Sequence, residues 1–391
     1  MGAVGEDAVT EGVVGEGVVT RQPGPLAAVV RGGRVESVHV GHLVVLHPDG
    51  SVRTAVGDPD ATIWPRSALK PVQAAAMLGC GLQIDDEGLA LACASHSGTP
   101  AHLAVVRRVL AAAGLSEADL RNTPDMPLDP AAADQWRRAG RGPASVTQNC
   151  SGKHAAMLAT CVRNGGSPGW GTASYLAPDH PVQRRVRETV ELLTGVGVED
   201  VTVDGCGAPL FSTTVRGLAR AFGLIAAAAS GEGRPGVPWW GEELWAQHDA
   251  FVRVGRVMRT YPWLVGGPGR DVSRFMAVVP GLVVKDGAEG VYAAGFADGT
   301  GVAFKVADGS ARARPVVLRD VLENRWQNDW TAAPDAWAVA EARDVGHVPV
   351  LGHGEPVGEL WGLVGAEGAD RAVVGAQWPV QEPVQRPEKE A

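Results

Sequence analysis

Lysine is scarce in this chain, and several of its lysines stand where an amine could do chemistry. Of the 35 basic residues only five are lysine, namely Lys70, Lys153, Lys285, Lys305 and Lys389. An amine that is removed from water can lose its proton, whereas a guanidinium group effectively cannot. Because arginine supplies nearly all the other positive charge, we examine the lysines as candidate bases and metal ligands.

The first lysine belongs to the segment RSALKPVQA, residues 66–74. Pro71 has no N–H and fits only the first turn of a helix, which predicts that a helix begins near Ser67. Residues three apart share one helix face, so Lys70 is expected beside Ser67. A neutral Lys70 would take the hydroxyl proton and activate Ser67 as a nucleophile, and helix N–H groups would hold the oxyanion. The alternative is an ordinary capping serine next to a solvated lysine.

Two thiols accompany the second lysine. Cys150 and Lys153 are three residues apart at the start of a predicted helix, a position that lowers the pKa of a thiol. Cys206 lies between two glycines in the segment DGCGAP, and Asp204 precedes it by two residues. The group predicts either a zinc site with two thiolates or a Cys150 nucleophile assisted by His154. The third interpretation is that both cysteines are buried core residues.

The third lysine, Lys285, ends an apolar segment and is followed by Asp-Gly. A lysine-x-glycine on a late strand, downstream of serine-x-x-lysine, is typical of penicillin-recognising serine enzymes. Between these two motifs lies SHSGTPAH, whose hydroxyls suit substrate contacts or a second catalytic serine, either Ser95 or Ser97. A solvated Lys285 and a structural His96 are the alternatives.

The elements predicted around these motifs mix strands and helices. Strands are expected at 38–46 and 52–56, joined as a hairpin, and at 276–284, 290–296 and 301–306. Strands from both ends of the chain with helices between them indicate an α+β fold. The helices expected from the sequence are 71–78, 101–113, 151–163, 181–193, 210–228, 245–259 and 315–323, with 121–143 as a surface connection.

Domain organisation follows from breakers and polar ends. Residues 1–24 and 378–391 are expected to be flexible tails. The chain between them, 25–377, is long enough for one catalytic unit, or for two intimate subdomains.

Composition limits the function further. The chain has 44 acidic and 35 basic residues and a formal charge of −9, which argues against binding of nucleic acid or of an anionic membrane surface. No apolar run approaches the length of a membrane span, and the first residues lack the features of a secretory signal. Five cysteines, an odd number, favour reduced thiols. We expect a cytoplasmic protein that acts on a small molecule.

Together the motifs resemble one family. The segments RSALKPVQA, ASHSGTPAH, NCSGKH, DGCGAP and KDGAEG follow one another in the order found in the Rhizobium-type, inducible L-asparaginases, the asparaginase II family. VRGGRVESVHVG, residues 30–41, is similar to the opening of that family, so the resemblance covers most of the chain. The chain departs from many relatives at Ala68, where they have serine, and in the stretch that contains Trp239, Trp240 and Trp245.

The resemblance implies a penicillin-binding-protein or serine-β-lactamase-like fold, with a mixed sheet, flanking helices and a helical part. It implies an amidohydrolase that converts L-asparagine to L-aspartate and ammonia, works as a homodimer and carries zinc. The implied residues are Ser67 with Lys70 and Ser95 with Lys285 for catalysis, Cys150, Lys153 and Cys206 for the metal, and Arg66, His96, Ser97, Asn149 and Asp204 for the substrate.

Two other functions stay open on the sequence. One is a different serine amidase or a penicillin-recognising hydrolase, which turnover of nitrocefin would reveal. The other is a non-catalytic zinc or redox module built on Cys150 and Cys206, which would leave the Ser67–Lys70 motif without a task.

Overall fold

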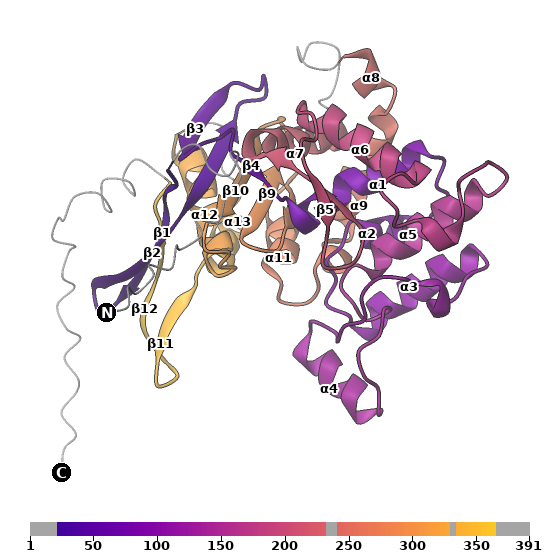
Figure 1. Ribbon diagram of the computed structural model, residues 1–391. Coiled ribbons are helices and arrows are strands. Elements are labelled where there is room, and N and C mark those ends of the chain that lie inside the picture. Colours follow the sequence, from indigo (N-terminus) through magenta and orange to yellow (C-terminus); the bar gives the residue numbers. More distant parts are fainter. Residues whose placement is uncertain (1–21, 232–240, 329–333, 365–391) are drawn as a thin grey trace, which may run out of the picture.

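The structure is a computed structural model that describes residues 22–231, 241–328 and 334–364 (Figure 1). Most of the tail expected at 1–24, the whole of that expected at 378–391 and the residues Trp239 and Trp240 lie outside these ranges. Gly24 already belongs to the first strand. None of the helices in the described ranges combines the length and the apolarity needed to cross a membrane.

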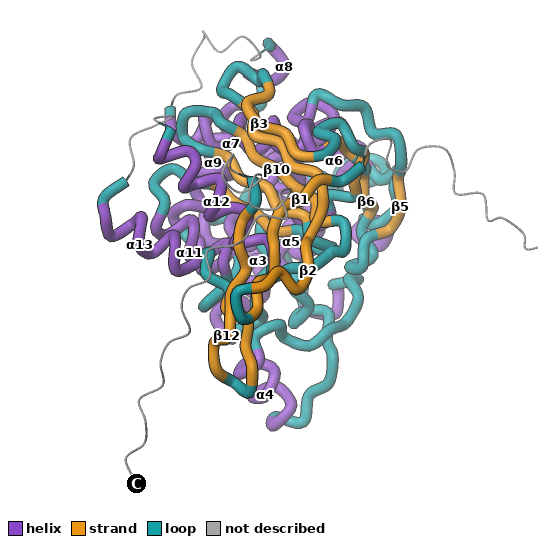
Figure 2. The backbone as a smooth tube through the Cα atoms, turned by 90° about the vertical axis from the view of Figure 1, so that its left-hand side faces the viewer, coloured by secondary structure: helices purple, strands orange, loops and turns teal. Residues whose placement is uncertain are grey.

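One curled sheet of eight strands dominates the described chain, and both ends of the chain contribute to it (Figure 2). Its order is β11-β12-β1-β2-β10-β9-β8, and β3 pairs with β2 at the side of this path. The mixture of strands and helices confirms the α+β prediction. The strands are β1 (Gly24–Arg31), β2 (Arg34–Leu46), β3 (Val52–Val56), β8 (Val283–Asp286), β9 (Val291–Gly295), β10 (Gly301–Val306), β11 (Pro349–Gly352) and β12 (Glu355–Gly362).

The expectation of a mixed sheet is wrong, because every pair of neighbouring strands in this sheet is antiparallel. The strands follow one another mainly through short hairpins, as β2 and β3 do across the predicted HPDG turn. A parallel neighbour would need a crossover connection of a dozen residues or more.

Helices lie on one side of the sheet and form a second, helical part beyond it (Figures 1 and 2). The long helix α7 packs on β9, β10 and β2, and α12 packs on β1 and β12. In the helical part, α1 packs on α5 and α6, and α2 and α3 pack on α5. The helices are α1 (Lys70–Gly79), α2 (Asp86–Ala92), α3 (Pro100–Ala112), α4 (Pro130–Arg138), α5 (Ser151–Arg163), α6 (Pro181–Thr194), α7 (Val215–Ser230), α8 (Glu242–Trp245), α9 (His248–Thr260), α10 (Pro262–Val265), α11 (Asp271–Val278), α12 (Ala313–Gln327) and α13 (Ala336–Val345).

Four predicted elements differ from the structure. The segment predicted as a helix from residue 210 starts with the short strands β6 (Pro209–Phe211) and β7 (Thr213–Thr214), because the Thr214 side chain caps α7 by accepting from Gly217 N–H. The strand predicted at 276–284 begins as the end of α11 and becomes β8 only after Pro280-Gly281. Short apolar runs do not distinguish a strand from a helix.

The third difference is in the predicted surface connection 121–143, which contains α4. The sequence carried a signal for this helix, since Asp129 accepts from Ala132 N–H as the N-cap and Pro130 follows at the first helical position. The helix predicted at 245–259 is also divided, into α8 and α9.

Two glycines allow α7 to lie directly on the sheet. A Cβ atom on Gly295 would stand 2.0 Å from the carbonyl oxygen of Phe222, and one on Gly301 would stand 2.1 Å from that of Ala219. Both neighbours are backbone atoms of a buried helix, which cannot move aside without disturbing the core.

We therefore expect Gly295→Ala to lower the free energy of unfolding by about 1–3 kcal/mol, the usual cost of overpacking. Gly197→Ala is the matched control, since a Cβ there meets no atom within 4 Å. Urea denaturation of the two variants measures the difference. Equal midpoints for both would contradict this account of the helix–sheet contact.

Candidate active site

Two lysines from different elements meet at Ser95. Lys70 begins α1 and places its Nζ 3.1 Å from Ser95 Oγ, and Lys285 on β8 places its Nζ 2.8 Å from the same atom. All three side chains are buried. Ser95 lies in the loop after α2, where its N–H donates to the carbonyl oxygen of Val265. The junction between the sheet and the helical part thus holds one hydroxyl between two amines.

The structure distinguishes between the two candidates for the second serine. Ser97 Oγ donates to the carbonyl oxygen of Gly266 at 2.8 Å and is buried, whereas Ser95 contacts Lys285. The two hydroxyls thus have partners on different segments, Lys285 of β8 for Ser95 and Gly266 for Ser97.

Ser67 lies in a single 3₁₀ turn, Arg66–Leu69, that leads into α1. Its side chain is half-buried, and Oγ makes no hydrogen bond with any described residue. Arg66 has a φ of 51°, a left-handed conformation that is costly for a residue with a Cβ. Such strain is concentrated at functional positions, where the surrounding structure enforces it.

Ser67 and Lys70 therefore do not lie on one face of a single α-helix, as the spacing predicts, because Ser67 belongs to the 3₁₀ turn and Lys70 begins α1. Ser67 is not the N-cap of α1; Leu69 is, and no side chain caps the helix. Lys70 Nζ donates to the carbonyl oxygen of Ala94 at 2.6 Å and lies 3.5 Å from that of Asn149, in addition to its contact with Ser95. The tertiary contacts, rather than the spacing of three residues, decide where the amine points.

A second cluster contains the two predicted thiols. Cys150, Cys206 and Lys153 are buried, and Lys153 Nζ stands 3.3 Å from Cys206 Sγ. A hydrogen bond from Cys150 and the charge of Lys153 outweigh burial and lower the pKa of Cys206 to about 5. The same hydrogen bond, together with burial, raises the pKa of Cys150 to about 12. Both shifts favour a thiolate at Cys206 and a neutral thiol at Cys150.

This cluster offers three donor atoms to a soft metal only if the Lys153 amine is one of the ligands. Among the described residues, no group of three or more His, Cys, Asp or Glu side chains could hold a metal ion. Two sulfur atoms and one nitrogen do converge, however, and thiolate sulfur with nitrogen is the donor chemistry of zinc. Lys153 would have to bind in its neutral form, so binding of the metal would release its proton.

Asp204 joins the thiol cluster to the turn that carries Ser67. Its Oδ2 is 3.7 Å from Cys206 Sγ, and its Oδ1 accepts from Arg66 Nε at 2.6 Å. Although burial opposes ionisation, the charges of Lys153 and Arg66 lower the pKa of Asp204. The carboxylate thus fixes the Arg66 side chain, which had been expected to bind substrate.

His96 makes internal hydrogen bonds through both ring nitrogens. Gly98 N–H donates to Nδ1 at 3.1 Å, so the neutral ring carries its proton on Nε2 and donates it to Ser151 Oγ at 2.8 Å. Burial holds the pKa of His96 well below its ordinary value. The ring therefore connects the Ser95 loop to the start of α5, the arrangement of a structural histidine.

Asn149 and His154 complete the predicted set. Asn149 Oδ1 accepts from Cys150 Sγ at 3.0 Å, and its carbonyl oxygen accepts from His96 N–H. His154 Nδ1 lies 2.8 Å from the hydroxyl of Tyr175. The hydrogen bonds of Cys150 thus go to Asn149 and, in the thiol cluster, to Cys206, which does not favour a Cys150 nucleophile activated by His154.

Three residues of the site were missed by sequence reasoning. Asp286 contacts the Lys285 amine, and Arg270 and Arg314 lie against the Asp286 carboxylate; only Asp286 stands in a motif, as the second residue of KDGAEG. The two arginines come from the start of α11 and from α12, and no local pattern predicts that they meet.

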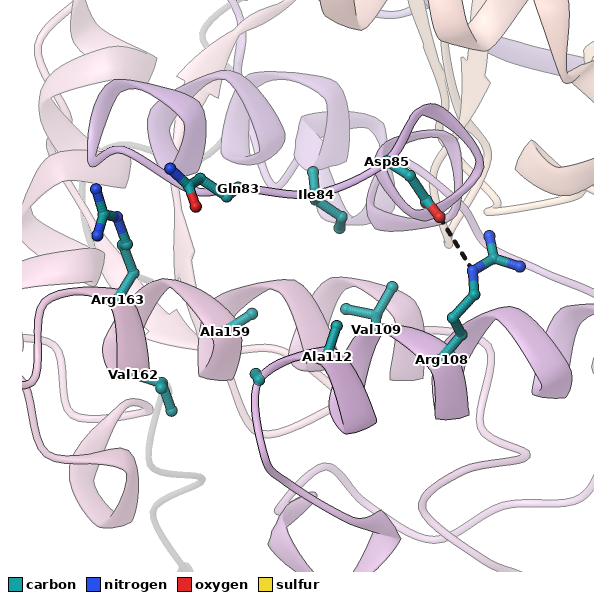
Figure 3. Close-up of a pocket in the computed structure, with 10 residues that line it drawn as sticks. Gln83, Ile84, Asp85, Arg108, Val109, Ala112, Ala159, Val162 and Arg163 are labelled. Carbon is teal, nitrogen blue, oxygen red and sulfur yellow. Dashed lines mark hydrogen bonds and ion pairs between the residues drawn. The ribbon is translucent and has the colours of Figure 1, made fainter.

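A surface groove of about 210 Å³ lies apart from these residues (Figure 3). It runs between the ends of α3 and α5 and the segment before α2, and none of the residues predicted to do chemistry lines it. Arg108 at its rim is already paired with Asp85 and Glu87.

Comparison with protein families identifies the chain. Residues 27–361 match the family described as L-asparaginase II. The chain belongs to the L-asparaginase II family. The resemblance seen in the motifs is confirmed.

Solved structures share only a distant likeness with the chain. "Crystal Structure Analysis of Mglu in its native form" has 15% sequence identity and a TM-score of 0.40, and the match covers 76% of this chain and 66% of that one. The structure of Mglu in 4.3 M NaCl has 15% sequence identity and a TM-score of 0.40, and the match covers 73% of this chain and 60% of that one. The structure of the glutamate form has 14% identity and a TM-score of 0.40, and the match covers 75% of this chain and 62% of that one. The chain thus spans less than two thirds of the length of these proteins. No curated protein matches it.

Proposed function

We propose that the protein hydrolyses the side-chain amide of L-asparagine to L-aspartate and ammonia. The observation that carries this proposal is the Ser95 hydroxyl held between the amines of Lys70 and Lys285, of which Lys70 directly follows the strained turn that contains Ser67. Membership of the L-asparaginase II family supports the choice of substrate.

We also propose that the fold is of the penicillin-binding-protein or serine-β-lactamase type. Three features support this. A serine-x-x-lysine leads into a helix, a second serine stands in a loop of the helical part, and a lysine lies on β8 of the sheet. This order of groups is that of the penicillin-recognising enzymes.

In the proposed reaction Ser67 Oγ attacks the amide carbon and gives its proton to neutral Lys70. The N–H of Ala68 already donates to the carbonyl oxygen of Pro65, so the oxyanion would use the N–H of Ser67 itself and other groups of this turn. The ester formed on Ser67 is then hydrolysed by water, and Lys70 returns the proton to Ser67.

In the proposed reaction Ser95 delivers the proton that ammonia needs. A serine hydroxyl has two acceptor positions and one donor hydrogen. When both amines donate to Oγ, the hydrogen is free to go to the leaving nitrogen. Lys285 then replaces it, so the proton reaches ammonia from a buried amine rather than from solvent.

Zinc is proposed at Cys150, Lys153 and Cys206. When bound, the ion would supply positive charge and a fixed geometry to this side of the site. Asp204 connects the thiol cluster to the turn that contains Ser67, because its carboxylate contacts both Cys206 and Arg66. The thiol cluster would thereby hold the turn in which Ser67 stands.

Removing both thiols is expected to abolish zinc binding. We expect stoichiometric zinc in the purified protein and none in Cys150→Ala/Cys206→Ala, measured by elemental mass spectrometry. Cys161→Ala is the control, since this buried thiol lies near His180 and away from the cluster. Stoichiometric zinc in the double variant would contradict the ligand assignment.

The function itself is tested by ammonia release from a panel of amides, measured with the zinc-loaded protein. Asparagine is expected to be hydrolysed and nitrocefin is not. Hydrolysis of nitrocefin would instead favour a penicillin-recognising hydrolase. The absence of ammonia from asparagine would favour the non-catalytic zinc or redox module.

A further inference from the structure

One carboxylate at the site is shared by three cationic side chains. Asp286 Oδ1 is in contact with Lys285 Nζ, which also donates to the carbonyl oxygen of Asp286 at 2.8 Å and to Ser95 Oγ at 2.8 Å. Asp286 Oδ2 accepts from Arg270 at 2.6 Å, and an NH1 atom of Arg314 lies 3.7 Å away. Lys285 is fully buried, and Asp286 is 6% exposed. We name Asp286, Arg270 and Arg314 the charge clamp.

The arginines of the charge clamp are held by groups other than Lys285. Arg314 NH1 donates to the carbonyl oxygen of Gly287 at 2.9 Å, and its guanidinium lies 5.8 Å from the centre of the Tyr292 ring. Arg270 immediately precedes α11 and occupies its N-cap position. Each arginine thus contacts the carboxylate partner of Lys285 rather than the amine itself.

The other groups that face Lys285 come from four elements. Lys70 on α1 adds a positive charge once it has taken the Ser67 proton, and Cys93 at the end of α2 is a neutral thiol whose pKa burial raises to about 12. Asp271 on α11 and Tyr292 on β9 lie behind the charge clamp, and burial keeps the Tyr292 hydroxyl neutral by raising its pKa. Asp286 is thus the carboxylate in contact with the amine, and its pKa stays low beside three cations.

A simple buried pair of Lys285 and Asp286 would lock the proton on the amine, because an opposite charge in contact stabilises the charged form. The two arginines oppose this effect because they pair with the same carboxylate, and Arg270 also adds positive charge that disfavours the charged amine. Burial, Lys70 and Arg270 outweigh Asp286 and lower the pKa of Lys285 to about 8.

We propose that Arg270 and Arg314 are positioning residues of the reaction, which share the Asp286 carboxylate so that Lys285 can release its proton through Ser95. In acylation the Ser95 proton moves to the leaving nitrogen, the Lys285 proton moves to Ser95, and the Ser67 proton moves to Lys70. In deacylation water gives hydroxide to the ester and a proton, by way of Ser95, to Lys285. Lys70 then returns its proton to Ser67, and every proton is accounted for.

The use of Lys285 as an acid rests on the proposed function, but the charge clamp itself can be measured without turnover. Because the chain has five lysines, protein labelled with [13Cε]lysine gives five signals, and Lys285→Met identifies that of Lys285 by its loss. Titration of this signal reports the pKa directly. The midpoint for Lys285 is expected near pH 8 in the wild-type protein.

The variants are expected to move this midpoint in opposite directions. Arg270→Gln should raise it by about one pH unit, and Asp286→Asn should lower it by about one unit or more, as for charges a few ångströms apart. Arg270→Lys keeps the charge and should restore the wild-type midpoint. Arg274→Gln is the matched control, since Arg274 lies on α11 and pairs with Asp344 at the surface.

The pH profile of kcat/KM for asparagine provides the functional readout. Lys285 acts as an acid, so kcat/KM should fall as the pH rises through about 8, and this limb should move with the midpoint in each variant. If Asp286→Asn does not fold, Arg270→Gln and Arg270→Lys still test the charge clamp, because only Arg270→Gln should raise the midpoint of Lys285.

Midpoints that stay unchanged in Arg270→Gln, or that move in the same direction in Arg270→Gln and Asp286→Asn, would overturn the charge clamp even in an active enzyme. Opposite shifts in a protein that releases no ammonia would instead support the charge clamp and reject the proposed function.

Discussion

Ser67→Ala is expected to reduce kcat for asparagine hydrolysis by roughly 10⁴-fold or more, the loss typical of removing a nucleophile. Without Oγ no ester forms, and neither lysine has a proton from Ser67 to accept. The measurement is ammonia release at saturating asparagine.

The stability of this variant is its control. Because Ser67 Oγ makes no hydrogen bond with any described residue, its loss should change the free energy of unfolding by less than about 0.5 kcal/mol. A folded Ser67→Ala protein with wild-type turnover would reject Ser67 as the nucleophile. A loss of activity together with a large loss of stability would show that the side chain holds the turn in place.

Ser95→Ala is expected to lower kcat by roughly 10²–10⁴-fold, the range for loss of a proton donor in the transition state. Ser95 Oγ is the atom at which the Lys70 and Lys285 amines meet, at 3.1 and 2.8 Å. Its removal interrupts the path from Lys285 to the leaving nitrogen.

Ser97→Ala is the matched comparison for this prediction. It too is a buried serine of the same loop, and its loss leaves the carbonyl oxygen of Gly266 unpaired. Each change thus removes buried hydrogen bonds, at about 1–3 kcal/mol of stability for each group left unpaired. If Ser97→Ala costs as much activity as Ser95→Ala, the loop rather than the Ser95 hydroxyl is what the reaction requires.

Local sequence patterns predict where the helices and strands of this fold lie better than they predict whether neighbouring strands are parallel or antiparallel. The helix expected at 151–163 has those bounds in the structure, and the strand expected at 301–306 is β10. Strands from both ends of the chain share one sheet, as expected. The antiparallel pairing depends on which strands become neighbours, and that is decided by packing of distant segments rather than by the alternation within each strand.

The same limit applies to the site. The spacing of Ser67 and Lys70 was interpreted as a shared helix face, but the 3₁₀ turn and the left-handed Arg66 change the geometry, and the amine turns to Ala94 and Ser95. Residues distant in sequence supply these partners, so no local rule could place the amine.

The charge clamp shows what sequence spacing omits altogether. Arg270 and Arg314 are two among 30 arginines, and neither stands in a motif. Their significance appears only when β8, α11 and α12 bring them to Asp286. The scarcity of lysine pointed to the amines, whereas the groups that regulate the Lys285 amine belong to the abundant residue type.

Hydrolysis of asparagine through an ester on Ser67 can be checked by trapping that ester. The zinc-loaded protein is mixed with asparagine, quenched with acid during turnover and digested for mass spectrometry. We expect one aspartyl group on the peptide that contains Ser67 and none in Ser67→Ala. An aspartyl group on Ser95 or Cys150 instead, or steady turnover by folded Ser67→Ala, would contradict it.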